Sequence, residues 1–114
     1  MEKCLEVKHN KIREKLINSK EYVEDVQKAS LIFSLLGEVS RMKIVLALLE
    51  GELCVYHICE ITGAKQSATS QHLRKLKDGN IVKCRKLNNQ VLYSIADEHV
   101  KTIINTAILH QNCC

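Results

Sequence analysis

The segment from residue 55 to residue 77 restricts the fold more than any other part of the chain. Apolar residues recur at helical spacing over about 55–61, and a polar segment with its own helical pattern follows over about 66–77. Between these segments, Thr62-Gly63-Ala64 forms a tight break, because glycine often ends a helix. Two helices joined by a short, glycine-containing turn are typical of a helix-turn-helix unit.

A two-stranded hairpin is predicted directly after this unit. The stretches 81–87 and 91–95 read as strands, and they flank Asn88-Asn89-Gln90. Asparagine tolerates the positive φ that tight hairpin turns require. A helix-turn-helix followed by a hairpin is the order of a winged helix-turn-helix, in which the hairpin is called the wing.

The rest of the chain is predicted to be helical, since it has no proline and only four glycines. The charged stretch 5–17 suits an exposed N-terminal helix or arm. Apolar spacing predicts helices over 22–36, ending at Gly37, and over about 44–49. Asp97 is the predicted N-cap of a final helix. The predicted fold class is therefore mainly α with a small β-hairpin, a winged helix-turn-helix.

The composition indicates a soluble globular protein. The chain has 114 residues, of which 46% are hydrophobic and 26% charged, and it shows neither a secretory signal nor an apolar run of membrane-spanning length. We therefore expect a cytoplasmic protein without membrane contact. Its six cysteines would be reduced there, which favours metal binding or redox sensing over disulfides. The net charge of +4 is by itself a weak indication of nucleic-acid binding.

The second helix of the pair has the side chains of a DNA-reading helix. Ala68, Leu73 and Leu76 are expected to face inward, and hydroxyl, amide and basic groups occupy the other positions. Such groups bind base edges and phosphates in a major groove, and the hairpin adds a basic wing. A merely solvated polar face is the alternative, which the succession of turn, polar helix and basic hairpin disfavours. The predicted DNA-binding residues are Gln66, Ser67, Thr69, Ser70, Gln71, His72, Arg74, Lys77, Arg85, Lys86, Asn88 and Asn89, with Lys83 and Gln90 nearby.

The final helix has four residues of the types that bind zinc, namely Asp97, His99, His110 and Cys113. His99, His110 and Cys113 form one stripe, because His110 lies about 20° and Cys113 about 40° from His99 around a helix axis, and Asp97 at the helix start can bend back toward His99. Along the axis, however, His99 and His110 are roughly 16 Å apart, whereas zinc ligands lie about 2 Å from the ion. One chain therefore cannot close the site.

A second copy of the chain would close it. An antiparallel final helix would bring Asp97 and His99 of one subunit to His110 and Cys113 of the other, giving two equivalent sites by symmetry. The alternative is that these are surface residues without a role. We expect a homodimer formed through the N- and C-terminal helices, with residues 1–20 as an arm or helix and residues 21–114 as the DNA-binding and dimerisation domain. The apolar residues expected to pack the two final helices are Val100, Ile103, Ile104, Ala107 and Ile108.

On these residues the chain resembles the ArsR/SmtB family of metal-sensing repressors. The similarity covers about residues 26–113 and is carried by Glu52-Leu53-Cys54-Val55, by residues 67–76, and by Asp97-Glu98-His99 with the two later ligands. The resemblance implies a homodimer that binds operator DNA when metal-free and leaves it on metal binding. The fourth ligand in the family is usually Glu or His, and Cys113 makes this site softer. Zn(II) is the expected ion, with Cd(II), Pb(II), Co(II) and As(III) as alternatives.

The resemblance also implies a second metal site, which uses an N-terminal arm and the first helix of the reading pair. Cys54 and His57 share a helix face at i and i+3. Family members usually have a cysteine where this chain has Tyr56, so the thiolate set is incomplete unless Cys59 substitutes; a buried core thiol is the expected role of Cys59. Cys84 is expected to pack on the hairpin. The candidate ligands of this second site are Cys4, His9, Cys54, His57 and Cys59.

Two other functions are compatible with parts of this pattern. A repressor of the same fold could sense oxidants or sulfide through a link between Cys113 and Cys114. A metal-buffering protein would use the ligands without binding DNA, and the basic wing disfavours it. An enzyme is not expected, because no nucleophile and base pair, phosphate loop or acidic dyad stands out.

Overall fold

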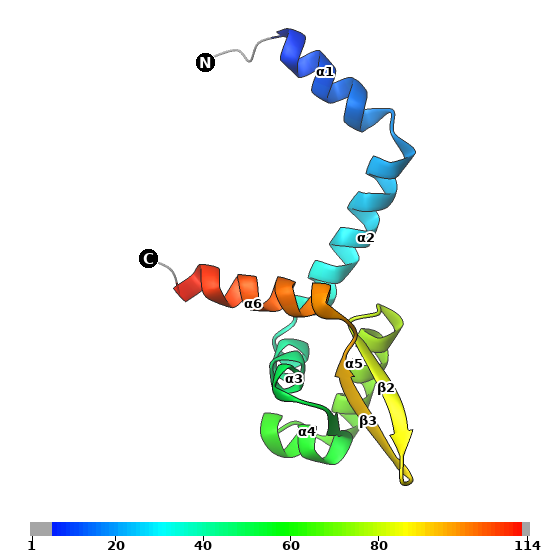
Figure 1. Cartoon of the computed structure of the whole chain (residues 1–114), viewed down its shortest axis with the longest axis vertical. Coiled ribbons are helices and arrows are strands. Elements are labelled where there is room, and N and C mark those ends of the chain that lie inside the picture. Colours follow the sequence, from blue (N-terminus) through cyan, green and yellow to red (C-terminus); the bar gives the residue numbers. More distant parts are fainter. Residues whose placement is uncertain (1–5, 113–114) are drawn as a thin grey trace. The chain divides into compact units, whose positions relative to one another are not determined.

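The computed structural model describes residues 6–112, which form six helices and three strands (Figure 1). The chain divides into two compact units, Met1–Phe33 and Ser34–Cys114, so the second unit begins near the end of the second helix. The domain boundary expected at residue 20 stays a prediction. In chain order the elements are α1 (Glu6–Ile17), α2 (Lys20–Leu36), α3 (Val39–Glu50), β1 (Leu53–Cys54), α4 (Val55–Thr62), α5 (Gln66–Asp78), β2 (Val82–Leu87), β3 (Gln90–Ile95) and α6 (Glu98–Asn112).

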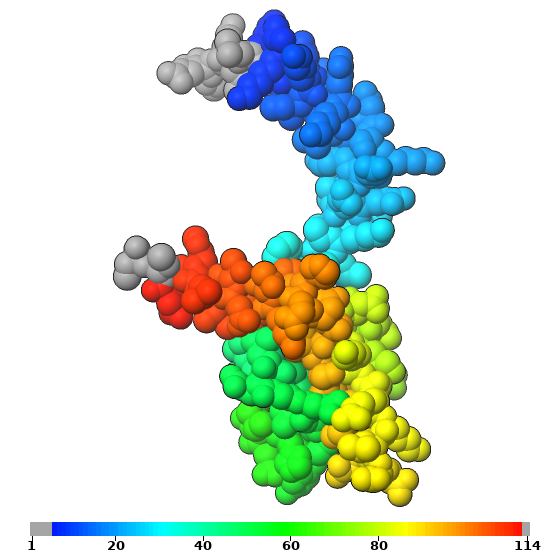
Figure 2. Space-filling model, in the orientation of Figure 1, coloured from blue at the N-terminus to red at the C-terminus, as the bar shows by residue number. Residues whose placement is uncertain are grey.

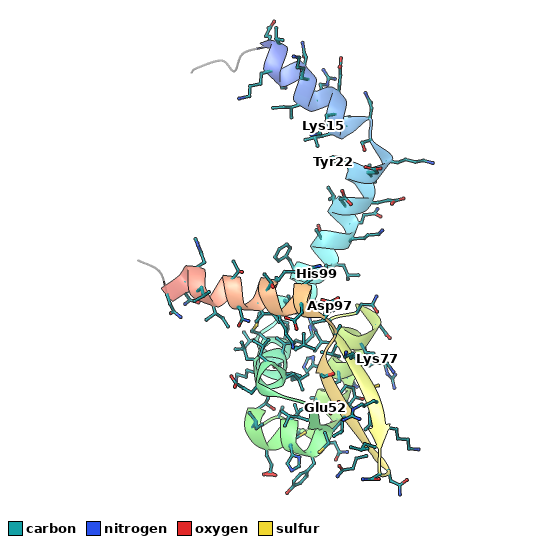
Figure 3. All side chains as sticks on the ribbon, viewed as in Figure 1. Lys15, Tyr22, Glu52, Lys77, Asp97 and His99 are labelled. Carbon is teal, nitrogen blue, oxygen red and sulfur yellow. The ribbon has the colours of Figure 1, made fainter. Side chains whose placement is uncertain are left out.

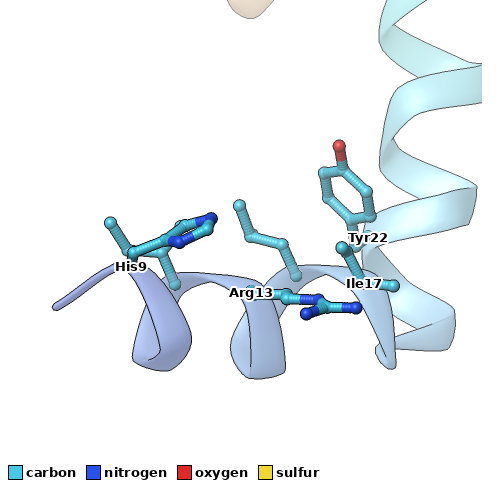
Figure 4. A pocket seen from close by; sticks show the side chains of 6 residues that line it. His9, Arg13, Ile17 and Tyr22 are labelled. Atoms are coloured by element: carbon cyan, nitrogen blue, oxygen red, sulfur yellow. The ribbon is translucent and has the colours of Figure 1, made fainter. Parts of the chain in front are cut away.

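The first unit contains α1 and most of α2. Every residue of α1 is exposed, as predicted for a charged N-terminal helix. Side chains of α1 and the start of α2 line a shallow pocket, which Figure 4 shows from close by. Its lining residues are His9, Ile12, Arg13, Leu16, Ile17 and Tyr22. Among residues 6–112, no helix has the length and apolar character needed to cross a membrane.

The hydrophobic core lies in the second unit, where α3, α4, α5 and the start of α6 pack with the sheet (Figures 1 and 2). Burying a valine, leucine or isoleucine side chain stabilises a fold by about 1.5–3 kcal/mol. The final helix contributes Val100 and Ile104, so its first turns are anchored on the domain. The other buried aliphatic residues include Ile44, Val45, Leu48, Ile58, Leu73, Leu76, Ile81, Val82 and Ile95.

Local contacts determine where α2 ends and α3 begins. Glu38 is the N-cap of α3, and its Oε2 accepts a hydrogen bond from the backbone N–H of Arg41 at 2.9 Å. The Nε of Arg41 donates to the carbonyl of Leu35 at 2.8 Å, which satisfies an acceptor at the end of α2. Gly79 lies so close to Leu35 that a Cβ at this position would overlap the leucine side chain. A larger residue at this position would therefore require the Leu35 side chain to move.

The helix-turn-helix unit consists of α4 and α5, which confirms the prediction. Gly63 follows α4 with a φ of 75°, in the left-handed region, and its N–H donates to the carbonyl of Cys59 at 2.8 Å. α5 packs against α3 and α4 through Thr69, Leu73 and Leu76, which are all buried. These residues follow an i, i+4, i+7 pattern and therefore lie on one face of the helix.

The wing belongs to a sheet with one strand more than predicted. β2 and β3 form the hairpin, and Asn88 and Asn89 have φ values of 49° and 69°, as the turn chemistry indicated. Gln90, expected in the turn, pairs with Leu87 instead. On the other side of β3, the two-residue strand β1 pairs antiparallel with it, so the strand order is β1-β3-β2. The predicted two-stranded hairpin is confirmed, whereas β1 was not predicted, because so short a strand leaves no periodic pattern.

Candidate DNA-binding surface and metal-binding residues

One face of α5 is exposed and polar, opposite the buried stripe. Lys65, at the N-cap position, makes no side-chain capping bond within the described chain, so the first N–H groups of α5 are open to an acceptor. An acceptor such as a phosphate is favoured at this end of a helix. His72 is half-buried. The predicted DNA-binding residues that are exposed on α5 are Gln66, Ser67, Ser70, Gln71, Arg74 and Lys77, the last labelled in Figure 3.

Two residues of α5 differ from the prediction in whether their side chains face the core or the solvent. Thr69 is 0% exposed, so the expectation that it contacts DNA was wrong. Ala68, expected to face inward, is exposed. The reason is the phase of the helix, because the stripe that includes Leu73 and Leu76 continues to residue 69 and not to residue 68. The Thr69 hydroxyl is buried without a hydrogen-bond partner among the described residues.

The wing carries exposed basic and amide groups, as predicted. Lys83, Lys86, Asn88 and Asn89 are all exposed. The hairpin extends along one side of the second unit (Figure 1), and its tip lies on the surface (Figure 2), whereas Val82 and Ile95 at its base are buried. β2 contacts α5, so the wing and the exposed helix belong to one packed domain. Together they form what we call the basic surface, which comprises the exposed α5 residues listed above with Lys83, Lys86, Asn88 and Asn89.

Arg85 of the wing pairs with an acidic residue that the sequence analysis did not select as functional. Its Nε donates to Glu52 Oε2 and its Nη2 to Glu52 Oε1, both at 2.7 Å. These hydrogen bonds lower the pKa of Glu52 and raise the pKa of Arg85, so both groups stay charged. Thirty-three residues separate the pair in sequence, and only the sheet brings them together. No local signal identifies such a partner.

The start of α6 brings together two of the four residues predicted to bind metal. His99 Nδ1 lies 3.8 Å from Asp97 Oδ1, and Figure 3 shows both residues at this end of the helix. Asp97 is also the N-cap, because its Oδ1 accepts from the backbone N–H of Val100 at 2.9 Å, which confirms the predicted cap. His110 is exposed in the last turn of α6, and Cys113 lies outside the described residues.

The apolar side of α6 differs from the prediction. Val100 and Ile104, expected to pack against a second copy of the helix, are buried within the chain's own domain. Ile103 is half-buried, whereas Ala107 and Ile108 are exposed. The first half of α6 thus faces its own core, since it follows directly from β3. Only its second half is left with uncovered apolar residues.

The donor chemistry on α6 suits a metal ion of the zinc type. Carboxylate, imidazole and thiolate groups are the ligands that zinc takes in proteins. The side chains of Asp97 and His99 are 53% and 95% exposed, so both are accessible to an ion. Within residues 6–112 of one chain, no three His, Cys, Asp or Glu side chains are grouped closely enough to hold a metal. A metal site that uses Asp97 and His99 would therefore need ligands from outside residues 6–112 of the same chain.

The residues of the predicted second site are only partly described. Cys54 Sγ lies 3.1 Å from His57 Nδ1, so the predicted neighbours do meet, with the thiol buried and the imidazole exposed. Cys59 is half-buried, and so is Cys84 on the wing. His9 is exposed on α1 in the first unit. Cys4 lies outside the described residues.

Residues 38–83, from the N-cap of α3 into β2, match the family model described as "Bacterial regulatory protein, arsR family". The chain is also similar to the cadmium resistance transcriptional regulatory protein CadC homolog of Staphylococcus aureus. The two are 44% identical over 81 residues, which is 70% of this chain and 67% of that protein.

Two solved structures share the fold. One is the homodimeric winged helix-turn-helix DNA-binding domain of a Mycobacterium bovis protein, with a TM-score of 0.79 and 24% identity over 83% of this chain and 88% of that one. The other is reduced HlyU from Vibrio cholerae, with a TM-score of 0.72 and 30% identity over 84% of this chain and 99% of that one. These similarities confirm the predicted fold class.

Proposed function

The chain belongs to the ArsR family of bacterial regulatory proteins, and from this premise we propose that it is a repressor that binds operator DNA as a metal-free homodimer and is released when a metal ion binds. The observation that carries the DNA-binding part is the basic surface, where the exposed face of α5 adjoins a wing of the same domain. The pairing of Asp97 with His99 at the exposed start of α6 supports the metal-binding part.

On the DNA, α5 would enter the major groove. Its exposed amides and hydroxyls, such as Gln71 and Ser70, have the donors and acceptors that read base edges. Arg74 and Lys77 would bind the flanking phosphates, and Lys83 and Lys86 would extend these contacts along the backbone. Two such helices in a homodimer would match half-sites about one helical turn of DNA apart.

The metal would be held by Asp97 and His99 of one subunit with His110 and Cys113 of the other. The argument for two subunits is the length of α6, because His99 and His110 are roughly 16 Å apart along it. When bound, the ion would supply a link between the two α6 helices. Zn(II) is the proposed ion, with Cd(II), Pb(II), Co(II) or As(III) as alternatives, and the name of the Staphylococcus aureus relative refers to cadmium resistance.

The chain itself provides a connection between α6 and the basic surface. Val100 and Ile104 are buried in the same core as Leu73 and Leu76 of α5. The backbone N–H of Ala96, just before α6, donates to the carbonyl of Ile81 at 3.0 Å, which ties the start of α6 to the strand that enters the wing. A shift of α6 would therefore act first on β3 and the wing, with which its start is packed. Changing the spacing of two reading helices would weaken binding to a fixed operator.

Fluorescence anisotropy with a duplex from the chain's own promoter tests the DNA-binding part. We expect nanomolar affinity that falls steeply with salt, and a weakening of tenfold or more in the Arg74→Ala variant, an order-of-magnitude figure for the loss of a charge-assisted contact. Binding without salt dependence, or equal affinity of the Arg74→Ala variant, would contradict it.

The metal-binding part is tested by titrating ZnCl2 into the preformed complex. The unsubstituted dimer should leave the duplex, whereas the His99→Ala/His110→Ala variant should bind DNA normally and stay bound. His57→Ala is the matched control, because it removes a histidine of the second candidate site and should still be released. Full release of the double variant would exclude α6 as the switch. Release by peroxide but not by metal would favour thiol sensing.

A further inference from the structure

We propose that Glu52 and Arg85 form a positioning pair that holds the wing in its DNA-binding orientation, so that Arg85 acts through Glu52 and not as a phosphate ligand. The inference rests on the proposed function and names a role within it. It also revises the sequence-based expectation for Arg85, which grouped it with the direct DNA contacts.

The pair joins the residue just before β1 to β2, on opposite sides of the central strand β3. Glu52 immediately precedes β1, and Arg85 lies in β2 opposite Leu92 of the central strand. Because β3 separates β1 from β2, the ion pair reaches across the central strand. Its acidic end therefore lies in the segment that leads into α4, and its basic end lies in the wing. The angle between wing and helix-turn-helix unit thus depends on this pair as well as on the strand ladder.

The geometry is that of a strong ion pair. Two hydrogen bonds of 2.7 Å join the guanidinium and the carboxylate, an arrangement that is more specific and more stable than a single contact. The Arg85 and Glu52 side chains are 59% and 29% exposed, so the pair lies at the surface and water weakens it. The guanidinium edge that faces Glu52 is occupied and cannot make the same two-point contact with a phosphate. Lys83 and Lys86 remain exposed for that purpose.

Electrostatic repulsion alone and a positioning role predict opposite changes in DNA affinity when the Glu52 carboxylate is removed. The Glu52 carboxylate lies close enough to Lys83 for the lysine charge to lower its pKa, so it places a negative charge beside the basic surface. A negative charge there repels DNA, and its removal should tighten binding. A positioning role predicts the opposite, since removing the carboxylate would release the wing. The sign of the effect therefore separates the two interpretations.

The test is operator binding by the full chain over a range of salt concentrations. Glu52→Gln and Arg85→Gln should each weaken binding by about three- to tenfold, the range expected for losing one well-formed exposed pair in each of two subunits. The double variant should bind the operator at least as tightly as the single variant with the lower affinity. The swapped pair, Glu52→Arg with Arg85→Glu, should recover most of the affinity. The salt dependence should stay unchanged throughout, because no phosphate contact is lost.

Two substitutions serve as matched controls. Lys86→Gln removes an exposed wing charge and should reduce the slope of log affinity against log salt by about 0.9 for each subunit. Glu60→Gln removes an exposed carboxylate from α4 and should not weaken binding. Thermal unfolding of every variant checks that the domain stays folded. If Glu52→Gln unfolds, the swapped pair, which keeps both charges, replaces it as the deciding variant.

Tighter binding by Glu52→Gln, with weaker binding and a smaller salt slope in Arg85→Gln, would overturn the inference, because Arg85 would then be a phosphate ligand. Unchanged affinity in both single variants would overturn it as well. If the unsubstituted chain binds no duplex, the proposed function fails first and the positioning role fails with it. If the unsubstituted chain binds but the swapped pair recovers nothing, the positioning role alone fails.

Discussion

Asp97 accepts a hydrogen bond from the backbone N–H of Val100 at 2.9 Å and so caps α6. The same carboxylate oxygen lies near His99 and belongs to the proposed metal site. One residue therefore has a structural role at the start of the helix and a proposed role as a ligand. The two can be separated, because asparagine is as good an N-cap as aspartate but offers a metal no negative charge.

Asp97→Asn should keep the stability of the fold and lose the response to metal. Asp97→Ala should lose both, with a free energy of unfolding lower by about 1 kcal/mol. Thermal unfolding measures the first effect, and metal-driven release from operator DNA measures the second. Metal release by Asp97→Asn at the same zinc concentration as the unsubstituted protein would show that this carboxylate is not a ligand.

Thr69→Val should leave DNA affinity unchanged, because residue 69 is buried and faces away from the basic surface. It should also keep or raise the unfolding free energy, by up to about 1 kcal/mol, since the Thr69 hydroxyl is buried without a partner among residues 6–112. Anisotropy and chemical denaturation provide the two measurements. Ser70→Ala, on the exposed face, is the matched control and should weaken DNA binding. A weakening by Thr69→Val alone would restore residue 69 as a DNA contact.

Glu38 should make the stability of the domain depend on pH in the acid range. The hydrogen bond from the Arg41 backbone N–H is the main cause that lowers the pKa of Glu38 below its ordinary value of 4.5. A carboxyl whose pKa is lower in the folded state stabilises the fold above its unfolded pKa. That contribution is lost as the pH falls below 4.5 and through the folded pKa.

The Glu38→Gln variant isolates this contribution. It should unfold at a lower temperature than the unsubstituted chain at pH 7, and the difference should shrink as the solution becomes more acidic than pH 4.5. Thermal unfolding followed by circular dichroism at several pH values measures both. A difference that is the same at all pH values would assign the effect to packing instead of to the carboxylate charge.

Gly63→Ala should destabilise the turn between α4 and α5. The φ of 75° at this position lies in the left-handed region, where a Cβ costs roughly 1 kcal/mol or more. No atom lies near the place of the added Cβ, so the cost comes from the backbone conformation and not from crowding. Gly63→Asn should cost less, because asparagine tolerates this region. Equal stability of all three proteins in chemical denaturation would contradict this account.

Several features could be predicted because they depend on a few neighbouring residues. Gly63 ends a helix, Asn88-Asn89 turns a hairpin and Asp97 caps α6 through backbone preferences and short-range hydrogen bonds. These rules act over three or four residues and need no knowledge of the rest of the fold. They sufficed for the winged helix-turn-helix order and for pairing Asp97 with His99 and Cys54 with His57.

Other features depended on which surfaces the folded chain brings together. The burial of Thr69 follows from how α5 packs on the core, and periodicity alone leaves that phase uncertain by one residue. For Val100 and Ile104, periodicity predicted burial but not that their own domain, and not a second α6, would cover them. The strand β1 and the contact between Glu52 and Arg85 exist only because the sheet forms, since their partners are distant in sequence. Local chemistry thus specified the elements and their ends, whereas packing decided which polar groups face solvent and which charges meet.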